Sequence, residues 1–305
     1  MNDCKFFTID DVAEALDSPA TLVLDVLYDK HFQRRHIAGA KSACVYEMVF
    51  LETVEEFAKE LDGLDTTILL YGAGPDSREA HFAAQKLSRV GYTDVCVYSG
   101  GLAEWTEMGQ PLEGSDVGCI DPDQPLFFPE QQVYKIDPEK SVIRWTGRNM
   151  NGGHYGTVGV KSGQLDFSSS MVGCVRVDMT SINNIDLDAD MKPVLEAHLA
   201  SDDFFFTSLF PEAILNIKSS EPVAPYWATS PNYHLDADLV MRGMTHPLAF
   251  SAYVSNVKGG IALQAQVELD RTCWDVLYGS SRFFKHLGFH VVFDVVSLDI
   301  YFRLE

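Results

Sequence analysis

The chain has 305 residues, of which 46% are hydrophobic, and its 44 Asp and Glu residues outnumber 23 Lys and Arg to give a formal net charge of −21. This length favours two domains, and the apolar fraction is too high for a disordered chain. Because nucleic acids and anionic membrane surfaces are bound by clustered Lys and Arg, the charge argues against both as partners.

Neither a membrane span nor a secretion signal is evident in the sequence. No segment approaches the roughly 18 consecutive apolar residues of a membrane-spanning helix. The start, MNDCKFFTIDD, lacks a basic region followed by a long apolar core. None of the 6 cysteines forms a CxxC pair, so we expect reduced thiols and no metal site. These features favour a cytoplasmic protein without stable membrane insertion.

The first third of the chain alternates between two kinds of pattern. Apolar, β-branched runs typical of buried strands are separated by amphipathic stretches typical of helices. In chain order, the patterns predict strands at residues 21–26, 66–72 and 94–101, and helices at 54–64 and 77–91. This alternation indicates an α/β domain with a mainly parallel sheet and flanking helices.

A linker is expected after this region. The stretch GSDVGCIDPDQPLFFPEQQ is rich in Gly and Pro and shows no periodicity. We therefore predict a first domain over residues 1–114, a linker over 115–132 and a second domain over 133–305.

Period-two patterns dominate the second domain. In YHLDADLVMRG, Leu235, Ala237, Leu239 and Met241 fall on one face of a strand, with polar residues between them. Strict alternation indicates antiparallel strands with one dry and one wet face. About eight such segments predict an all-β barrel or sandwich. Two short helical insertions are expected, at DMKPVLEAHLAS and GSSRFFKHLG.

Four phrases in the first domain carry a family resemblance. LVLDV, HIAGA, ILLYG and YTDVCVYSGGLAEW follow one another within residues 5–112, and together they resemble the rhodanese-like domain. The resemblance implies a parallel sheet whose active loop lies at the carboxyl edge of the strands, where open sheets usually bind ligands. It also matches Asp25 to a strand-end aspartate, which we expect to orient the following backbone turn.

The loop after residue 71 lacks the nucleophile that this family uses. In the family, a cysteine thiolate accepts sulfane sulfur as a persulfide, and loop N–H groups stabilise the anion. One branch of the family reads YCxGPxC here, whereas in this chain Tyr71 is followed by Gly72, Ala73, Gly74, Pro75, Asp76 and Ser77. Gly72 and Ser77 stand at the two cysteine positions, so we expect sulfur transfer to be lost.

Two interpretations of this degenerate loop stay open. It is either a structural relic that closes the strand–helix turn or a docking site for a small anion or a partner. The rival functional hypothesis is a sulfurtransferase with a relocated thiol, for which Cys44 is the candidate because it follows HIAGA. Cys96 lies in an apolar strand pattern and is expected in the core.

The second domain carries a resemblance of its own. YKIDPEKSVIRWTG, HLASDDFFFTSLFPEAIL, LVMRGMTHPLAF and LDRTCWDVLYGSSRFFKHLGFHVVFDVVSLDI are spaced over residues 134–305 and resemble the YceI-like domain. The resemblance implies a lipocalin-like antiparallel barrel that binds a polyisoprenoid or a similar long amphiphile. It implies no catalytic constellation.

A barrel of about eight strands has room either for one long apolar ligand or for packed side chains. The candidate ligand contacts are apolar residues on inward-facing or helix-linked positions: Trp145, Val158, Phe167, Val177, Phe204, Phe205, Leu239, Met241, Phe250, Leu263, Val267, Phe283, Phe284 and Val296. Asp294 falls on an apolar face and needs a partner, for which Arg271 and Arg282 are candidates. Such a pair would be either a structural ion pair or an anchor for a ligand head group.

These observations predict a non-catalytic binding protein. We expect the barrel to carry or sense a polyisoprenoid, a quinone or a fatty-acid-like lipid, with no other cofactor, and the first domain to serve in docking or regulation. An exposed apolar tunnel mouth would favour a homodimer. The alternatives are the sulfurtransferase with a relocated cysteine and a scaffold whose barrel is filled by its own side chains.

Overall fold

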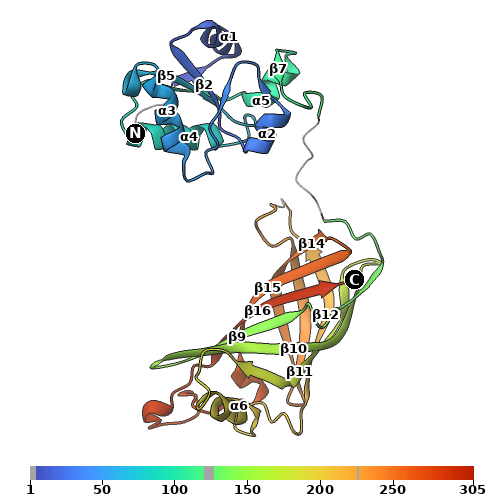
Figure 1. Cartoon of the computed structure of the whole chain (residues 1–305). Coiled ribbons are helices and arrows are strands. Elements are labelled where there is room, and N and C mark those ends of the chain that lie inside the picture. The colour runs from blue at the N-terminus through green and yellow to red at the C-terminus, as the bar shows by residue number, and fades with distance from the viewer. Residues whose placement is uncertain (1–4, 120–126, 225–226) are drawn as a thin grey trace. The chain divides into compact units, whose positions relative to one another are not determined.

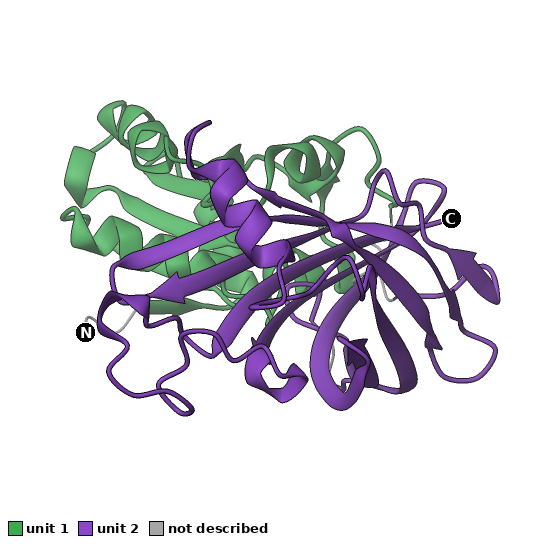
Figure 2. Ribbon diagram, turned by 90° about the horizontal axis from the view of Figure 1, so that it is seen from below, with its two compact units in different colours: residues 1–121 green, residues 122–305 purple. Residues whose placement is uncertain are grey.

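The computed structural model describes residues 5–119, 127–224 and 227–305. The chain divides into two compact units, residues 1–121 and 122–305 (Figure 2). Part of the predicted linker, residues 120–126, lies outside the described residues. Within that linker, Ser115 and Asp116 donate backbone hydrogen bonds to the first unit, and the Tyr134 hydroxyl in the second unit accepts hydrogen bonds from the backbone N–H groups of Glu130 and Gln131.

The first unit is built on a five-stranded parallel sheet, which confirms the predicted α/β class (Figure 1). In spatial order its strands are β1 (Lys5–Phe7), β6 (Val95–Tyr98), β5 (Thr67–Tyr71), β2 (Thr21–Asp25) and β4 (Lys41–Ser42). A second, two-stranded antiparallel sheet pairs β3 (His36–Ile37) with β7 (Leu112–Glu113). The helices of the unit are α1 (Ile9–Asp17), α2 (Asp29–Arg34), α3 (Phe50–Lys59), α4 (Glu79–Arg89), α5 (Gly101–Glu107) and the 3₁₀ helix η1 (Gly63–Asp65).

The central strands are buried on both faces, which explains their continuous apolar runs. Along β5, Ile68 and Leu70 contribute to one core cluster, and Leu69 and Tyr71 contribute to another. Side chains of α3 and α4 share the first cluster, whereas side chains of α1 and α5 share the second. The helices therefore cover opposite faces of the sheet.

Local signals set the ends of the helices. At the start of α1, the Thr8 hydroxyl accepts a hydrogen bond from the Asp11 N–H at 3.4 Å, and the Asp11 carboxylate accepts one from the Thr8 N–H at 2.7 Å. This reciprocal capping box satisfies two N–H groups that the helix leaves free. Beyond α4, Gly91 has a φ of +105°, the left-handed conformation in which glycine commonly ends a helix.

Asp25, at the carboxyl end of β2, is fully buried. Its Oδ1 accepts a hydrogen bond from the backbone N–H of Leu27 at 2.8 Å, which confirms that it orients the turn after the strand. Burial, only partly offset by this hydrogen bond, raises the pKa of the Asp25 carboxyl from 3.8 to about 6. A carboxylate in this position therefore costs stability at neutral pH.

Replacing Asp25 with asparagine should flatten the pH dependence of the first unit's stability. Because the folded pKa is the higher one, the folded state binds a proton more tightly than the unfolded state. The resulting stabilisation is complete below the ordinary value of 3.8 and is lost as the pH rises through about 6, at about 1.4 kcal/mol per pKa unit. Urea unfolding across this range should show that the stability of the wild type falls relative to that of the variant as the pH rises. Equal declines in both proteins would contradict the prediction.

The second unit is a closed barrel of eight antiparallel strands, which confirms the predicted lipocalin-like fold (Figure 1). Pairing of β16 with β9 and of β10 with β11 closes the barrel. The strands are β9 (Val142–Asn149), β10 (Gly152–Asp166), β11 (Val172–Asn184), β12 (Glu212–Pro222), β13 (Tyr233–Met241), β14 (Met244–Val257), β15 (Gly260–Asp270) and β16 (Val295–Leu304). A short strand, β8 (Val133–Lys135), also pairs with β10.

The additional helices of this unit lie at one end of the barrel. Figure 1 shows α6 (Lys192–Ala200) there, together with the segment that joins β15 to β16. This segment contains the 3₁₀ helices η2 (Arg271–Trp274) and η3 (Gly288–His290). The α6 region therefore agrees with the predicted insertion DMKPVLEAHLAS.

Two predictions for the segment between β15 and β16 are wrong. GSSRFFKHLG forms turns rather than an α-helix, because His286 and Gly288 adopt positive φ angles of 58° and 56°. Asp294 was predicted on the apolar face of a strand, but the final strand begins at Val295, so Asp294 precedes it, and Val292 forms only an isolated bridge with Asn149.

Candidate ligand-binding site

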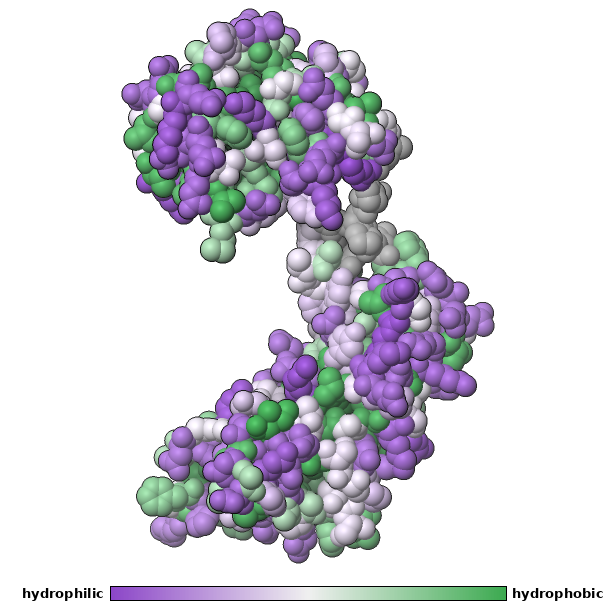
Figure 3. All heavy atoms as spheres, viewed as in Figure 1, coloured by the Kyte–Doolittle hydropathy of each residue, from purple (hydrophilic) through white to green (hydrophobic). Residues whose placement is uncertain are grey.

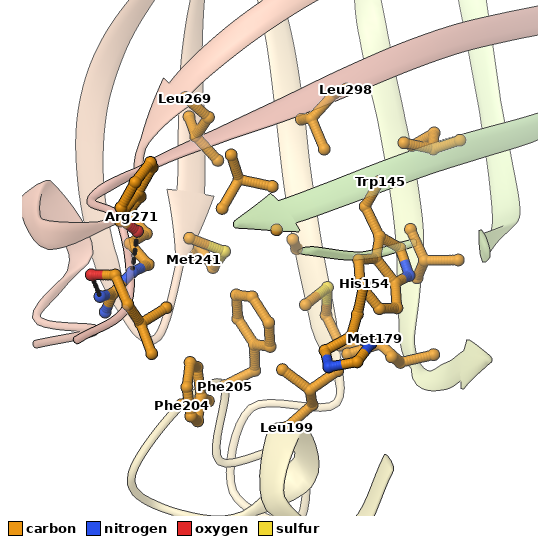
Figure 4. Close-up of a pocket in the computed structure, with 18 of the residues that line it drawn as sticks. Trp145, His154, Met179, Leu199, Phe204, Phe205, Met241, Leu269, Arg271 and Leu298 are labelled. Atoms are coloured by element: carbon orange, nitrogen blue, oxygen red, sulfur yellow. Dashed lines mark hydrogen bonds between the residues drawn. The ribbon is translucent and has the colours of Figure 1, made fainter. Parts of the chain in front are cut away.

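The barrel encloses a cavity of about 370 Å³ that opens at the end carrying α6. Alternation along the strands aims one side chain in two at this cavity, and the register places Val267 beside Leu298, and Leu298 beside Trp145. Figure 4 shows Met241, Leu269 and Leu298 directed into the space from different strands. The apolar strand residues of the wall are Ile143, Trp145, Val158, Val177, Met179, Ile182, Ala213, Leu215, Leu239, Met241, Leu248, Val267, Leu269, Val296, Leu298, Ile300 and Phe302.

The open end is narrowed by α6 and the turn that follows it. Leu199, Phe204 and Phe205 line the cavity from this segment, and Figure 4 shows them reaching towards the strand residues. The Phe204 ring lies 4.9 Å from the His198 ring and 5.3 Å from the Tyr278 ring, measured between centroids. This aromatic contact joins α6 to the segment after β15.

Polar side chains that line the cavity gather near the same end. His154 Nδ1 lies 2.8 Å from Asp186 Oδ2, and His198 Nε2 lies 3.1 Å from Asp203 Oδ2. Tyr278 also lines the cavity. An apolar cavity wall with a few polar groups at one end suits a ligand with a long apolar chain and a small polar head. Among the described residues, no group of three or more His, Cys, Asp or Glu side chains is placed to hold a metal ion.

Arg271 is 2% exposed and holds the loop at the cavity mouth. Its guanidinium donates hydrogen bonds to the backbone carbonyls of Phe293 at 3.1 Å, Tyr278 at 2.7 Å and Val292 at 3.1 Å, and also to that of Val276. Two of these carbonyls, those of Val292 and Phe293, lie just before β16, which explains why the strand begins only at Val295. Burial lowers the pKa of the Arg271 guanidinium from its ordinary value.

Asp294 lies beside Arg271 in the same loop. Its Oδ1 lies 3.9 Å from Arg271 Nη2, and its Oδ2 lies 3.6 Å from Arg282 Nη1. Both predicted partners therefore contact it. Because Arg271 is satisfied by backbone carbonyls, we interpret the cluster as a structural ion pair that anchors the loop, rather than as a head-group anchor.

Replacing Arg271 with methionine should lower the free energy of unfolding of the barrel by about 3 kcal/mol, because four backbone carbonyls lose a buried charged donor. Urea denaturation of the full chain, followed at the barrel transition, measures this loss. Arg282→Met is the matched control, since Arg282 is 56% exposed and its ion pairs should contribute less than about 1 kcal/mol. Equal losses in the two variants would exclude this role.

Nine of the 14 predicted ligand contacts line the cavity: Trp145, Val158, Val177, Phe204, Phe205, Leu239, Met241, Val267 and Val296. The other five lie elsewhere. Phe167 packs against Tyr134 and Phe127, Leu263 and Phe250 belong to the barrel core, and Phe283 and Phe284 are exposed on the loop before β16. Leu263 lies on the inward face of β15, and Phe167 follows the end of β10, but neither lines the cavity.

Several cavity residues were missed in the sequence. Leu269 and Leu298 carry the same alternating signal as their neighbours and could have been included. Met179 lies on β11 two residues beyond the predicted contact Val177 and therefore on the same face of the strand. No pattern points to His154 on β10, His198 on α6 or Tyr278 in the segment after β15, because the packing of these distant segments brings them to the mouth.

In the first unit, the degenerate loop packs against α5. Leu102 N–H donates to the Gly72 carbonyl at 3.0 Å, and Ala103 N–H donates to the Ala73 carbonyl at 2.9 Å. Gly74 and Ser77 bond to each other through both backbone and hydroxyl, at 2.9–3.2 Å. The loop thus keeps a closed turn although it has no thiol.

The carboxylate of Glu79 occupies the space beside Gly72. A Cβ atom added at Gly72 would lie 2.8 Å from Glu79 Oε2. Glu79 Oε1 accepts a hydrogen bond from the Tyr46 hydroxyl at 3.1 Å, whereas the buried Oε2 has no hydrogen-bond partner among the described residues. Burial and the adjacent Glu79 raise the pKa of Tyr46 to about 12. A negative charge therefore stands where the family places its sulfur anion.

The candidate relocated thiol is poorly accessible. Cys44 is 6% exposed and Cys96 is 1% exposed and lies on β6, as predicted for a core residue. Of the five cysteines that the structure describes, only Cys273 is exposed, and it belongs to the barrel unit.

Comparison with known families accounts for both units. A model of the YceI-like domain matches residues 134–304, and a model of the rhodanese-like domain matches residues 8–108. The chain belongs to the YceI-like family, with a rhodanese-like domain fused ahead of the barrel. No curated protein matches the chain. No helix in the described part of the chain is long and apolar enough to cross a membrane.

Solved structures resemble each unit separately. The crystal structure of Burkholderia cenocepacia BcnA is 15% identical, covers 56% of this chain and 99% of its own, and has a TM-score of 0.44. A polyisoprenoid binding domain from Saccharophagus degradans, implicated in plant cell wall breakdown, is 13% identical over 56% of this chain and 97% of its own, with a TM-score of 0.40. The Alr3790 protein from Anabaena sp. is 28% identical over 34% of this chain and 76% of its own, with a TM-score of 0.28.

Proposed function

We propose that this chain is a non-catalytic binding protein that carries or senses a polyisoprenoid-like or other long-chain amphiphile in its barrel. The observation that carries the proposal is the apolar cavity of about 370 Å³, which is within the range of roughly 300–1,000 Å³ for small-molecule sites. Each buried CH₂ group of a hydrocarbon ligand would contribute about 0.8 kcal/mol. Membership of the YceI-like family supports the same ligand class.

The polar groups at the mouth favour a ligand with a small head. His198 and Tyr278 line the cavity beside Phe204, so a hydroxyl, quinone or carboxyl head group would meet hydrogen-bonding partners there while the chain fills the barrel. In this proposal the rhodanese-like unit serves for docking or regulation, since Glu79 faces the position that sulfur chemistry would need. Cys44 and Cys96 are buried and form no disulfide with any residue that the structure describes, which agrees with a reducing, cytoplasmic setting.

Native mass spectrometry of the purified full chain, combined with solvent extraction, tests the proposal. We expect a bound lipid that extraction removes and that a long-chain isoprenoid alcohol replaces in a titration. A chain that is isolated empty and takes up no long-chain lipid would refute it, and would favour a scaffold.

A further inference from the structure

Exposed aromatic residues gather on one side of the cavity mouth. The rim loop, residues 279–293, carries Phe283 (51% exposed), Phe284 (47%), Phe289 (88%) and Phe293 (47%). Large apolar side chains with this exposure normally mark an interaction site when they cluster. In Figure 3, hydrophobic residues lie on the surface at this end of the barrel, among hydrophilic ones.

The rim loop is joined to the tip of the β9–β10 hairpin. The Phe293 N–H donates a hydrogen bond to the Arg148 carbonyl at 2.9 Å, and Asn149 and Val292 form a β-bridge. At the hairpin tip, Met150 is 69% exposed. The rim loop and the hairpin tip therefore form one continuous surface, which we call the rim surface.

The rim surface differs in charge from the rest of the molecule. Residues 140–165 and 276–293 contain no Asp or Glu, although the chain has 44 of them. The exposed cations here are Arg148, Arg282 and Lys285, and Lys285 forms no salt bridge with any residue that the structure describes. Arg282 pairs with Asp270 at 2.7 Å and anchors the base of the loop. Asp294 and Asp270 lie at the base of the loop beside Arg282, and further acidic residues lie in the segments flanking α6, at Asp186, Asp188, Asp190, Asp202 and Asp203.

The cavity wall continues onto the rim surface. Phe289 and Phe293 line the cavity and are also exposed to solvent, as is Arg148. A hydrocarbon chain that leaves the cavity here would pass along apolar side chains. This continuity matters because a long-chain lipid has very low solubility in water and resides in a bilayer.

We propose that the rim surface docks onto the surface of a phospholipid bilayer, so that the barrel exchanges its ligand with the membrane without releasing it into water. The inference rests on the proposed function. Phenylalanine side chains would enter the interface, and Arg148 and Lys285 would meet lipid phosphates. Because the net charge of −21 repels anionic surfaces, the contact suits a zwitterionic bilayer. This docking is peripheral and reversible.

Flotation of the full chain with phosphatidylcholine vesicles tests the proposal. The wild type should float with the vesicles, and the Phe283→Ser/Phe284→Ser variant should partition at least about tenfold less, since burying one Phe is worth this factor. Neither residue lines the cavity, so lipid occupancy measured by native mass spectrometry should stay unchanged. Lys285→Glu should also weaken vesicle binding, because a carboxylate would replace a cation that meets the lipid phosphates. Phe128→Ser is the matched control, because Phe128 is 65% exposed and contacts the hairpin between β14 and β15 at the opposite end.

Three outcomes would overturn the docking proposal. The wild type could remain unbound, the double variant could float as well as the wild type, or light scattering could show a dimer that the double variant abolishes while vesicles are not bound. A chain that takes up lipid from detergent but ignores vesicles refutes docking and leaves the proposed function intact. A chain that binds vesicles but never holds lipid in its barrel refutes the proposed function instead.

Discussion

Replacing Ala213 with tryptophan should abolish lipid binding by the barrel while leaving the fold intact. Ala213 is 4% exposed, lies on β12 opposite Val177 and lines the cavity. An indole at this position would take up space that the ligand chain needs. Displacing about four CH₂ groups costs roughly 3 kcal/mol, so the Kd should rise at least about a hundredfold. Native mass spectrometry with lipid titration measures the change.

The matched control places the same residue on the outside of the same strand. Lys218 lies on β12 with a side chain 51% exposed and pairs with Asp238 at 2.7 Å. Lys218→Trp should bind lipid as the wild type does, because the indole would face solvent. Both variants should keep the wild-type thermal unfolding temperature within a few degrees. An A213W protein that still binds lipid with wild-type affinity would show that the ligand lies elsewhere.

The class of the barrel could be predicted from the sequence, but the cavity could be predicted only in part. Alternation shows which face of a strand a residue occupies, so Leu263 and Val267 were both assigned inward. They are four residues apart, about 13 Å along the strand. Val267 pairs with Leu298 near the open end, whereas Leu263 pairs with Phe302 at the floor. Height along the barrel axis depends on the pairing of distant strands, which no local pattern reveals.

The mouth of the barrel was the hardest part to predict. RFFKHLG has a pattern that resembles an amphipathic helix, but positive φ angles at His286 and Gly288 and the capture of nearby carbonyls by Arg271 give a turn-rich loop. Phe283 and Phe284 were therefore assigned to the ligand wall and lie instead on the outer rim. A tertiary interaction overrode the local preference in this segment.

In the first unit, the sequence shows that the loop has no cysteine, but it does not show that the Glu79 carboxylate lies beside the cysteine position. Gly72 is identified by its place after β5. Glu79, the first residue of α4, looks like an ordinary acidic residue in a first helical turn. Only the folded loop shows that its carboxylate turns back to within 2.8 Å of the position of a Gly72 Cβ.

Restoring the thiol should therefore require two substitutions rather than one. In Gly72→Cys, the new side chain would meet the Glu79 carboxylate, which disfavours a second negative charge and raises the thiol pKa. Gly72→Cys/Glu79→Gln removes that charge and keeps the side-chain shape. Each pKa unit recovered increases the thiolate fraction about tenfold. We expect the double variant to exceed Gly72→Cys by at least this factor in a thiosulfate:cyanide assay.

The steps of the thiosulfate:cyanide reaction explain why the activities of the loop variants should differ. The thiolate introduced in place of Gly72 attacks the sulfane sulfur of thiosulfate, an S–S bond forms, and sulfite leaves with the electron pair of the broken bond. Cyanide then takes the outer sulfur as thiocyanate and regenerates the thiolate. Glu79→Gln alone supplies no nucleophile in the loop, so it should remain at the wild-type background. If Gly72→Cys alone were as active as the double variant, the Glu79 charge would not lower the sulfurtransferase activity of a thiol in this loop. If the wild type were active and Cys44→Ser abolished that activity, the relocated thiol would be the nucleophile and the chain would be an enzyme.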